Sequence, residues 1–550
     1  MIEDEKKEQK NLMLALVLII ALLLGMQWWQ KPKTQMVAVP LDGPAENAET
    51  VAAEAVPAVD MTSRKSVEAA QEIITIPVEN SVVAGSLNAG GTDLNNLSLT
   101  TYRETTQEDS PFVVLLSRNW QTGLNWEGGS LPDTRQTPQV VGEKLTPETP
   151  VIMRWENETA RIERTITLDN AYMMTFTDKL TNKSGRAIEA RLIGRVERTV
   201  DSVNTTQSSV HEGFLSLVDN TRVEERWSAI EPGDSKAMAT KGGWIGMTDK
   251  YWQAIFVPEQ SATTQMTFNA TETNYTATFQ NTAEIAAGAT KTQTTKLFAG
   301  AKELSLINDY EEQGIPRFDL TIDFGWYYFL TKPFLYFLGF LYSLVGNMGV
   351  AILVFATLLR ILMLPIATKT YENMAKMKKL QPKIKALQER FKDNKQQLQI
   401  EMMNLYKRDK VNPAGGCLPM LIQIPVFFAL YKVLSVSILM RQAPFFGWIT
   451  DLSQPDPSSV FTAFGLLAWP IPSFLNIGVW PIIMGLTMVI QQKMNPSPTT
   501  SEDQKVIMNL MPIIFTFMMG NFASGLVIYW TWSNILSIMQ QRYIMKKVGA

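Results

Sequence analysis

The chain has 550 residues, a formal net charge of −3 at pH 7 and a mean hydropathy of −0.02. Its single cysteine, Cys417, excludes an internal disulfide, and its single histidine, His211, excludes a metal site built from several histidines of one chain. No Gly-Lys dipeptide occurs, so the Walker A phosphate loop is absent.

The N-terminal part contains an uncharged run, LMLALVLIIALLLGMQWW, at residues 12–29. Its length fits a membrane span, and its two final tryptophans fit a membrane–water interface. We interpret residues 1–30 as an uncleaved transmembrane anchor. A cleaved signal peptide is the alternative, but no well-placed small-residue cleavage site lies near the end of the run. Residues 31–60, rich in Ala, Pro and Glu and free of aromatic residues, predict a flexible linker.

Residues 61–322 contain short runs rich in Thr, Val, Ile and aromatic residues, such as ARIERTITL at 160–168, separated by turn residues. Many short strands without helical periodicity predict a large antiparallel β-sandwich. The single histidine, in SSVHEGF, has no Cys or carboxylate cluster nearby at metal-ligand spacing. We therefore expect a surface or hydrogen-bonded histidine, and we find no catalytic constellation in this segment.

From about residue 324 to the end, the chain carries long apolar runs. Residues 323–347, DFGWYYFLTKPFLYFLGFLYSLVGN, are rich in aromatic residues and predict an interfacial amphipathic helix lying along the membrane. Apolar runs long enough to span a membrane follow at 348–364, 418–440, 477–494, 506–522 and 525–543. Together with the N-terminal anchor they predict six transmembrane helices, five of them forming a core at 348–550.

Basic residues set the orientation, because Lys and Arg near membrane ends favour the cytoplasm. Between Pro365 and Cys417 lie 12 Lys or Arg residues against five Asp or Glu residues, so this loop is predicted inside and the β-sandwich outside. Two apolar stripes at helical spacing flank the break KDNK in this loop: Leu380, Ile384, Leu387 and Phe391, then Leu398, Met402, Leu405 and Tyr406. We expect a cytoplasmic helical hairpin at about 370–411; a solvated charged linker is the alternative.

Polar residues interrupt the apolar runs near their predicted cytoplasmic ends. Arg360 is the only charge in its run, where a lone arginine costs about 3 kcal/mol on insertion scales. No Asp or Glu occurs in any of the six runs. The other polar residues at this depth include Thr357, Gln423, Gln491, Asn509 and Asn534. We interpret the set as the lining of a wet groove open to the cytoplasm. Interfacial amides and an Arg360 that snorkels to the headgroups are the alternative.

Helical periodicity assigns faces to some of these residues. In the last run, four residues share one face: Trp530, Asn534, Ser537 and Gln541. Lys432, the second cation within an apolar run, lies nine residues after Gln423 and hence on the opposite face of its helix. We expect Lys432 to avoid the groove and to snorkel outward.

Four stretches match a known family: RILMLPIATKTYENMAKMKKLQPKIKALQERF from residue 360, EMMNLYKRDKVNPAGGCLPMLIQIPVFFALYKVL from 401, MGLTMVIQQKM from 484 and FASGLVIYWTWSN from 522. With the overall layout, they resemble the YidC/Oxa1/Alb3 membrane protein insertases of the Gram-negative bacterial type. The resemblance implies a polytopic α-helical membrane protein with a periplasmic β-supersandwich. It also implies a hydrophilic groove centred on Arg360, in which Tyr529 and Trp530 are candidate client contacts.

Two features depart from the family pattern. Many relatives carry a second Tyr where this chain has Trp530, so a hydroxyl contact with clients is not expected from that position. The outer loop carries an apolar stretch at 461–475, FTAFGLLAWPIPSFL, that is longer than in enterobacterial relatives. We assign no role to this stretch.

The resemblance implies an inner-membrane insertase and chaperone that acts alone or with the Sec translocon. Its expected partners are nascent membrane proteins, the Sec translocon, the ribosome and signal-recognition machinery, and membrane lipids. It is not expected to be an enzyme, and no cofactor, metal or small-molecule substrate is expected. A small-molecule transporter and a carbohydrate-active enzyme on an anchor are the rival interpretations.

Overall fold

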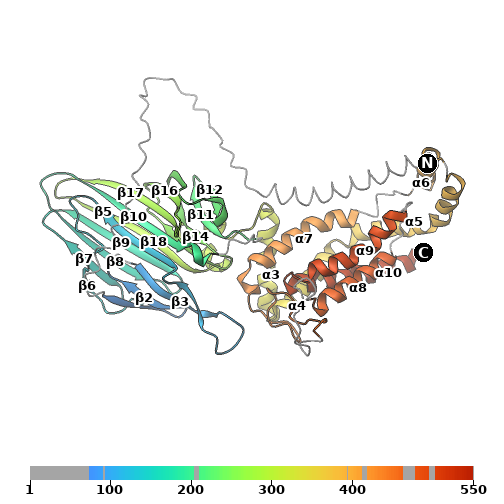
Figure 1. The fold of residues 1–550 in the computed structure, drawn as a ribbon, viewed down its shortest axis with the longest axis horizontal. Coiled ribbons are helices and arrows are strands. Elements are labelled where there is room, and N and C mark those ends of the chain that lie inside the picture. Colours follow the sequence, from blue (N-terminus) through green and yellow to red (C-terminus); the bar gives the residue numbers. More distant parts are fainter. Residues whose placement is uncertain are drawn as a thin grey trace, which may run out of the picture. The chain divides into compact units, whose positions relative to one another are not determined.

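The structure is a computed structural model that describes residues 74–90, 93–203, 210–392, 394–409, 411, 418–462, 477–494 and 502–548. The predicted anchor at 1–30 and linker at 31–60 lie outside the described residues, as does most of the stretch 461–475. Strands occupy the described chain up to Ala301, and the helices from Leu304 onward follow them (Figure 1).

The described strands form three sheets in which every strand pair is antiparallel. The first sheet consists of β1 (Thr75–Glu79), β2 (Val83–Asn88), β3 (Asp93–Arg103) and β4 (Phe112–Leu116). The second, in spatial order, consists of β13 (Ser235–Lys241), β16 (Thr263–Ala270), β17 (Asn274–Ile285), β10 (Ile188–Thr199) and β5 (Trp120–Glu127). The third, in spatial order, consists of β12 (Thr221–Arg226), β11 (Gly213–Val218), β14 (Trp244–Thr248), β15 (Trp252–Val257), β18 (Thr290–Ala301), β9 (Met173–Asn182), β8 (Ala160–Leu168), β7 (Val151–Glu156) and β6 (Gln139–Val141).

Aromatic side chains join the second and third sheets. Phe214 of β11 stacks on Phe268 of β16 with ring centroids 4.9 Å apart, and Phe256 of β15 packs edge-on against Phe279 of β17 at 5.5 Å. Residues alternate between buried and more exposed along β8, as expected for strands with one face in a core. The predicted antiparallel β-sandwich is therefore confirmed.

The main helices follow the strands: α2 (Leu304–Glu312), α3 (Tyr328–Val345), α4 (Met348–Leu362), α5 (Leu364–Arg390), α6 (Lys395–Arg408), α7 (Leu418–Val436), α8 (Val479–Met494), α9 (Glu502–Met519) and α10 (Ser524–Val548). Short 3-10 turns lie at η2 (Val200–Ser202), η3 (Trp227–Ala229), η4 (Phe318–Thr321) and η6 (Ile438–Met440). Helix α10 contacts α4, α5, α7 and α8, and α3 packs against α4 and α7. The described C-terminal region is therefore helical, with α10 in contact with most of its neighbours.

A sharp bend separates α4 from α5. The side chain of Asn347 caps the start of α4 by accepting a hydrogen bond from the Val350 N–H at 3.0 Å. The two helices meet at 67° around Met363, and Pro365 follows in the first turn of α5. Because proline has no N–H, it cannot continue the hydrogen bonding of α4 into α5. The bend lies just after Arg360, which is in the last turn of α4.

Helices α5 and α6 pack together through an apolar cluster. The cluster consists of Met377, Leu380, Ile384, Leu405, Tyr406 and Val411, with Leu387 and Met402 packed against it. These residues include most of the two stripes named from the sequence. The connection between the helices is short, since α5 ends at Arg390 and α6 begins at Lys395.

The prediction of six transmembrane helices is not confirmed. Among the described residues, α3 alone is long and apolar enough to cross a membrane by itself, and the bent pair α4–α5 is a second candidate if taken as one span. Shorter apolar helical segments lie at Gln423–Val436 and Met508–Met519. Helix α3 belongs to the segment that the sequence predicts to lie along the membrane. Its length and hydropathy fit either a membrane-spanning or an interfacial helix.

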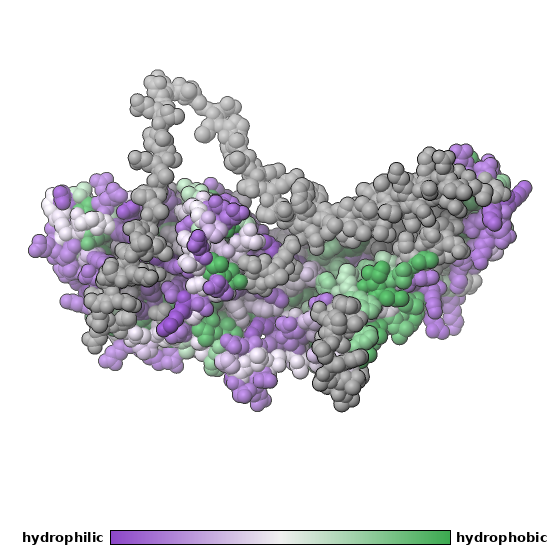
Figure 2. All heavy atoms as spheres, in the orientation of Figure 1, coloured by the Kyte–Doolittle hydropathy of each residue, from purple (hydrophilic) through white to green (hydrophobic). Residues whose placement is uncertain are grey.

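Apolar side chains are exposed over much of the helical part. Figure 2 shows a hydrophobic area there, while hydrophilic residues are frequent over the strands. The exposed apolar residues include Leu344, Leu362, Leu486, Ile513, Ile514 and Phe517. An exposed apolar surface of this kind fits contact with lipid.

Candidate functional site

Arg360 is held by helix α10. Its Nη2 donates to the backbone carbonyl of Ser533 at 2.9 Å, to Ser533 Oγ at 2.8 Å and to Ser537 Oγ at 2.5 Å. Within the described parts of the chain, Arg360 forms no ion pair. Its charge is therefore solvated by uncharged oxygen atoms and is not neutralised by a carboxylate.

Thr357 lies one turn before Arg360 and also faces α10. Its hydroxyl donates to the Leu353 carbonyl at 2.8 Å and accepts a hydrogen bond from Trp532 Nε1 at 2.9 Å. Helices α4 and α10 are thus joined by polar contacts at two successive turns.

A third helix, α7, contributes Gln423. Its Nε2 donates to the hydroxyl of Tyr529 at 2.9 Å, and Tyr529 is buried. The neighbouring Trp530 packs edge-on against Phe427 of α7 with ring centroids 4.6 Å apart. The four sequence-predicted residues Thr357, Arg360, Gln423 and Tyr529 therefore make their polar contacts between α4, α7 and α10.

Asn534, Gln491 and Asn509, the other predicted site residues, make no hydrogen bond to Arg360 in the described parts of the chain. Asn534 donates from Nδ2 to Thr487 Oγ1 of α8 at 3.1 Å and is buried. Gln491 in α8 is half-buried, and Asn509 in α9 is exposed. These side chains belong to the α8 and α9 side of the helical part, where they do not join the polar contacts around Arg360.

The face of α10 that the sequence assigns to one groove contacts two different helices. Ser537 faces Arg360 of α4, whereas Asn534 and Gln541 bond to residues of α8, the latter through Gln541 Nε2 and the Met494 carbonyl at 3.4 Å. Sequence reasoning did not identify Ser533. Ser533 could have been found from its spacing, because Ser533 and Ser537 lie four residues apart in an apolar run and therefore share a helix face.

Lys432 makes an ion pair at the other end of α7. Its Nζ lies 2.5 Å from Asp323 Oδ2, and Arg222 Nη1 of β12 lies 3.5 Å from Asp323 Oδ1. Burial alone would raise the pKa of Asp323, but the charges of Lys432 and Arg222 hold that pKa well below its usual range. Lys432 thus lies away from Arg360, as the helical spacing predicts, and it is paired with a carboxylate from outside the apolar runs.

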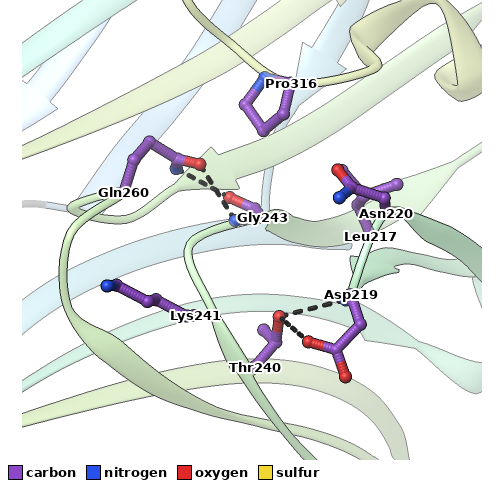
Figure 3. Close-up of a pocket in the computed structure, with 8 residues that line it drawn as sticks. All are labelled: Leu217, Asp219, Asn220, Thr240, Lys241, Gly243, Gln260 and Pro316. Atoms are coloured by element: carbon purple, nitrogen blue, oxygen red, sulfur yellow. Dashed lines mark hydrogen bonds between the residues drawn. The ribbon is translucent and has the colours of Figure 1, made fainter.

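The β-sandwich contains a pocket of about 380 Å³, shown in Figure 3. Its lining residues are Leu217, Asp219, Asn220, Thr240, Lys241, Gly243, Gln260 and Pro316. Gln260 bonds through its amide to both the N–H and the carbonyl of Gly243, each at 2.9 Å, and Thr240 Oγ1 donates to Asp219 Oδ1 at 3.3 Å. Much of the polar lining is therefore bonded to itself, and the pocket shares no residue with the Arg360 contacts.

The sequence predicts that His211 lies at the surface or is hydrogen-bonded. In the structure it is buried and hydrogen-bonded. Its Nε2 lies 2.9 Å from the Phe214 carbonyl, and burial lowers its pKa to about 4. Among the residues that the structure describes, no group of three or more His, Cys, Asp or Glu side chains is arranged to hold a metal ion.

Comparisons with known proteins cover nearly the whole chain. A family model described as the 60Kd inner membrane protein matches residues 340–550, and one described as the YidC periplasmic domain matches residues 75–337. A membrane protein insertase YidC of Beijerinckia indica subsp. indica is 40% identical over 586 residues, covering 99% of this chain and 97% of its own length. The insertase YidC of Methylobacterium radiotolerans is 43% identical, covering 86% of this chain and 81% of its own length. A solved structure described as an active YidC insertase aligns with 86% of this chain and 92% of its own, at 18% identity and a TM-score of 0.36.

Proposed function

This chain belongs to the YidC family of membrane protein insertases, and we propose that it inserts and helps to fold client membrane proteins through a groove centred on Arg360. It is an inner-membrane protein whose β-sandwich is the periplasmic domain. In the proposed mechanism, the groove opens to the cytoplasm, receives the polar flank of a hydrophobic segment and lets the segment move sideways into lipid.

The observation that carries the proposal is the bonding of Arg360 to uncharged oxygen atoms of Ser533 and Ser537. A guanidinium without a carboxylate partner keeps its positive potential available to a guest. At 4 Å separation and an effective dielectric constant near 20, an acidic group is attracted by about 4 kcal/mol before desolvation costs reduce this value. An acidic or polar flank is therefore drawn toward Arg360.

The driving force of the proposed insertion is the transfer of the client's own apolar side chains. Each Å² of apolar surface that leaves water contributes about 25 cal/mol. The exposed apolar residues of α8 and α9, such as Leu486, Ile513 and Phe517, supply a surface along which such a segment can reach lipid. The proposal requires no catalytic residue and no cofactor.

The proposed partners follow from charge and location. The α5–α6 hairpin carries many Lys residues, which suits contact with ribosomal RNA or with anionic lipid headgroups on the cytoplasmic side. Signal-recognition machinery is proposed to deliver clients on the same side. The periplasmic β-sandwich is proposed to dock the Sec translocon, with which the insertase acts on part of its clients.

Substitutions of Arg360 test the proposed function. Arg360→Lys should retain much of the insertion activity because it keeps the positive potential, whereas Arg360→Ala and Arg360→Glu should lose activity, most severely for clients with acidic flanks. The measurement is insertion into proteoliposomes of matched clients that differ only in flank charge, with each variant at equal abundance. Equal insertion of acidic-flank clients by Arg360→Glu and by the unsubstituted protein would refute the electrostatic role.

A further inference from the structure

Every hydrogen bond that Arg360 makes to the residues the structure describes comes from one nitrogen. Nη2 carries two hydrogens, and it lies within 2.9 Å of Ser533 O, 2.8 Å of Ser533 Oγ and 2.5 Å of Ser537 Oγ. The hydroxyl of Ser537 donates its own hydrogen to the Ser533 carbonyl at 2.7 Å, so its oxygen acts as an acceptor toward Arg360. Both serines are buried. The two hydrogens of Nη2 are therefore directed at α10.

The occupation of Nη2 limits how a client carboxylate can bind. The strongest carboxylate–arginine contact uses two parallel hydrogen bonds from one edge of the guanidinium. One such edge consists of Nη1 and Nη2, and the other consists of Nε and Nη2. Since Nη2 belongs to both edges, its bonds to the two serines block both two-point arrangements. Within the described ranges, Arg360 makes no hydrogen bond from Nε or Nη1, so these atoms remain for single contacts.

We infer that Ser533 and Ser537 are positioning residues that restrict Arg360 to one-point contacts with acidic groups of a client. This inference rests on the proposed function, because it assumes that client flanks approach Arg360. A one-point contact attracts an acidic flank through the full positive charge but holds it weakly. An insertase has to release every segment it receives, and a two-point clamp would retain acidic flanks in the groove.

The test is the release rate of two fluorescent peptides from the full-length protein in proteoliposomes. Both peptides carry the same apolar segment, one with an acidic flank and one with a neutral flank. Replacing both serines by Ala frees one hydrogen of Nη2, because the Ser533 backbone carbonyl is then the one acceptor left for it among the described residues. We expect the double variant to release the acidic peptide about tenfold more slowly, as one added charge-assisted hydrogen bond implies, and to release the neutral peptide at the unchanged rate.

Two control variants separate positioning from a general effect on packing. Thr531→Ala removes a buried hydroxyl of α10 that donates to the Val527 carbonyl at 2.8 Å and does not contact Arg360, so both release rates should stay unchanged. Replacing Ser533 and Ser537 by Thr keeps the hydroxyls and should restore normal release. Equal slowing of both peptides, or no slowing of the acidic one, would overturn the inference.

An Arg360→Ala arm distinguishes the failure of this inference from the failure of the proposed function. The proposed function requires faster release of the acidic peptide from this variant. If that acceleration occurs while the serine-to-alanine variant releases the acidic peptide normally, the inference alone is wrong. If Arg360→Ala changes neither release rate, the proposed electrostatic role is wrong and the inference fails with it.

Discussion

At the scale of single residues, two arginines of this chain are held in opposite ways. Arg164 of β8 is fully buried, and its Nε and Nη2 each lie 2.7 Å from a carboxylate oxygen of Asp178, its cross-strand neighbour in β9. Trp126 Nε1 also donates to Asp178 Oδ2 at 2.7 Å. Among the described residues, the acceptors of Arg360 are two hydroxyls and one carbonyl. The first arrangement neutralises a charge inside a core, and the second leaves a charge available.

Removing Asp178 should destabilise the β-sandwich strongly. In Asp178→Ala the guanidinium of Arg164 stays buried without its carboxylate, and we expect a loss of about 3–5 kcal/mol in the free energy of unfolding. The measurement is chemical denaturation followed by tryptophan fluorescence. Glu163→Ala is the matched control, because its pair with Arg154 is partly exposed and should contribute less than about 1 kcal/mol. A small loss in both variants would contradict this prediction.

His211 should make the stability of the folded protein depend on pH. Burial is the main cause that lowers its pKa from the ordinary histidine value of 6.5 to about 4. Between these two values the unfolded chain binds more protons than the folded one, so stability falls as pH falls through this window. The contribution is complete above about pH 6.5, and the slope is at most about 1.4 kcal/mol per pH unit.

The variant His211→Gln tests this pH dependence. Its amide can donate to the Phe214 carbonyl in place of the ring nitrogen, and it does not titrate. We expect its free energy of unfolding to change less than that of the unsubstituted protein between pH 6.5 and pH 4. Identical slopes in the two proteins would show that His211 is not the titrating group.

At the scale of elements, helix α7 is tied to the segment before α3 and to the β-sandwich. Lys432 forms an ion pair with Asp323, and the backbone N–H of His211 donates to the same carboxylate oxygen, Asp323 Oδ2, at 2.8 Å. A second tie follows η6, where Arg441 Nη2 donates to the Arg103 carbonyl at 2.5 Å. The polar contacts at this end of α7 join it to Asp323 and Arg103, whereas Gln423 bonds to Tyr529 of α10.

Breaking the Lys432 pair should loosen this junction without affecting Arg360. In Lys432→Met the buried carboxylate of Asp323 loses its nearest cation, and we expect a destabilisation of about 3 kcal/mol with faster hydrogen exchange in α7 and β11. Lys493→Met in α8 is the control, because Lys493 is exposed. Unchanged exchange in the Lys432 variant would argue that the pair contributes nothing to the junction.

At the scale of the whole molecule, we expect the periplasmic strands and the helices to carry different tasks. We expect deletion of much of the β-sandwich, with residues 323–347 retained, to leave insertion largely intact, since the retained segment keeps Asp323 for Lys432 and the packing of α3 on α4 and α7. Insertion of several clients into proteoliposomes is the measurement. Loss of insertion for every client at a normal protein level would show that the domain itself is required.

The sequence by itself determined those features that depend on local composition. Short runs rich in Thr, Val, Ile and aromatic residues predicted the strands. The stripes around Leu380 and Leu405 predicted the packed hairpin helices, and a lone Arg360 in an apolar run marked the candidate site. It also separated Lys432 from Gln423, because helical geometry fixes the angle between residues of one helix.

Only the tertiary structure decided which neighbours those side chains meet. Ser533 is 173 residues from Arg360, and Asp323 is 109 residues from Lys432, so no spacing within one helix could identify either pair. Periodicity placed Ser537 and Asn534 on one face of α10, but that face is wide enough to contact both α4 and α8. The hydropathy of α3 suits both a spanning and an interfacial helix, because hydropathy measures affinity for an apolar environment and carries no information about direction.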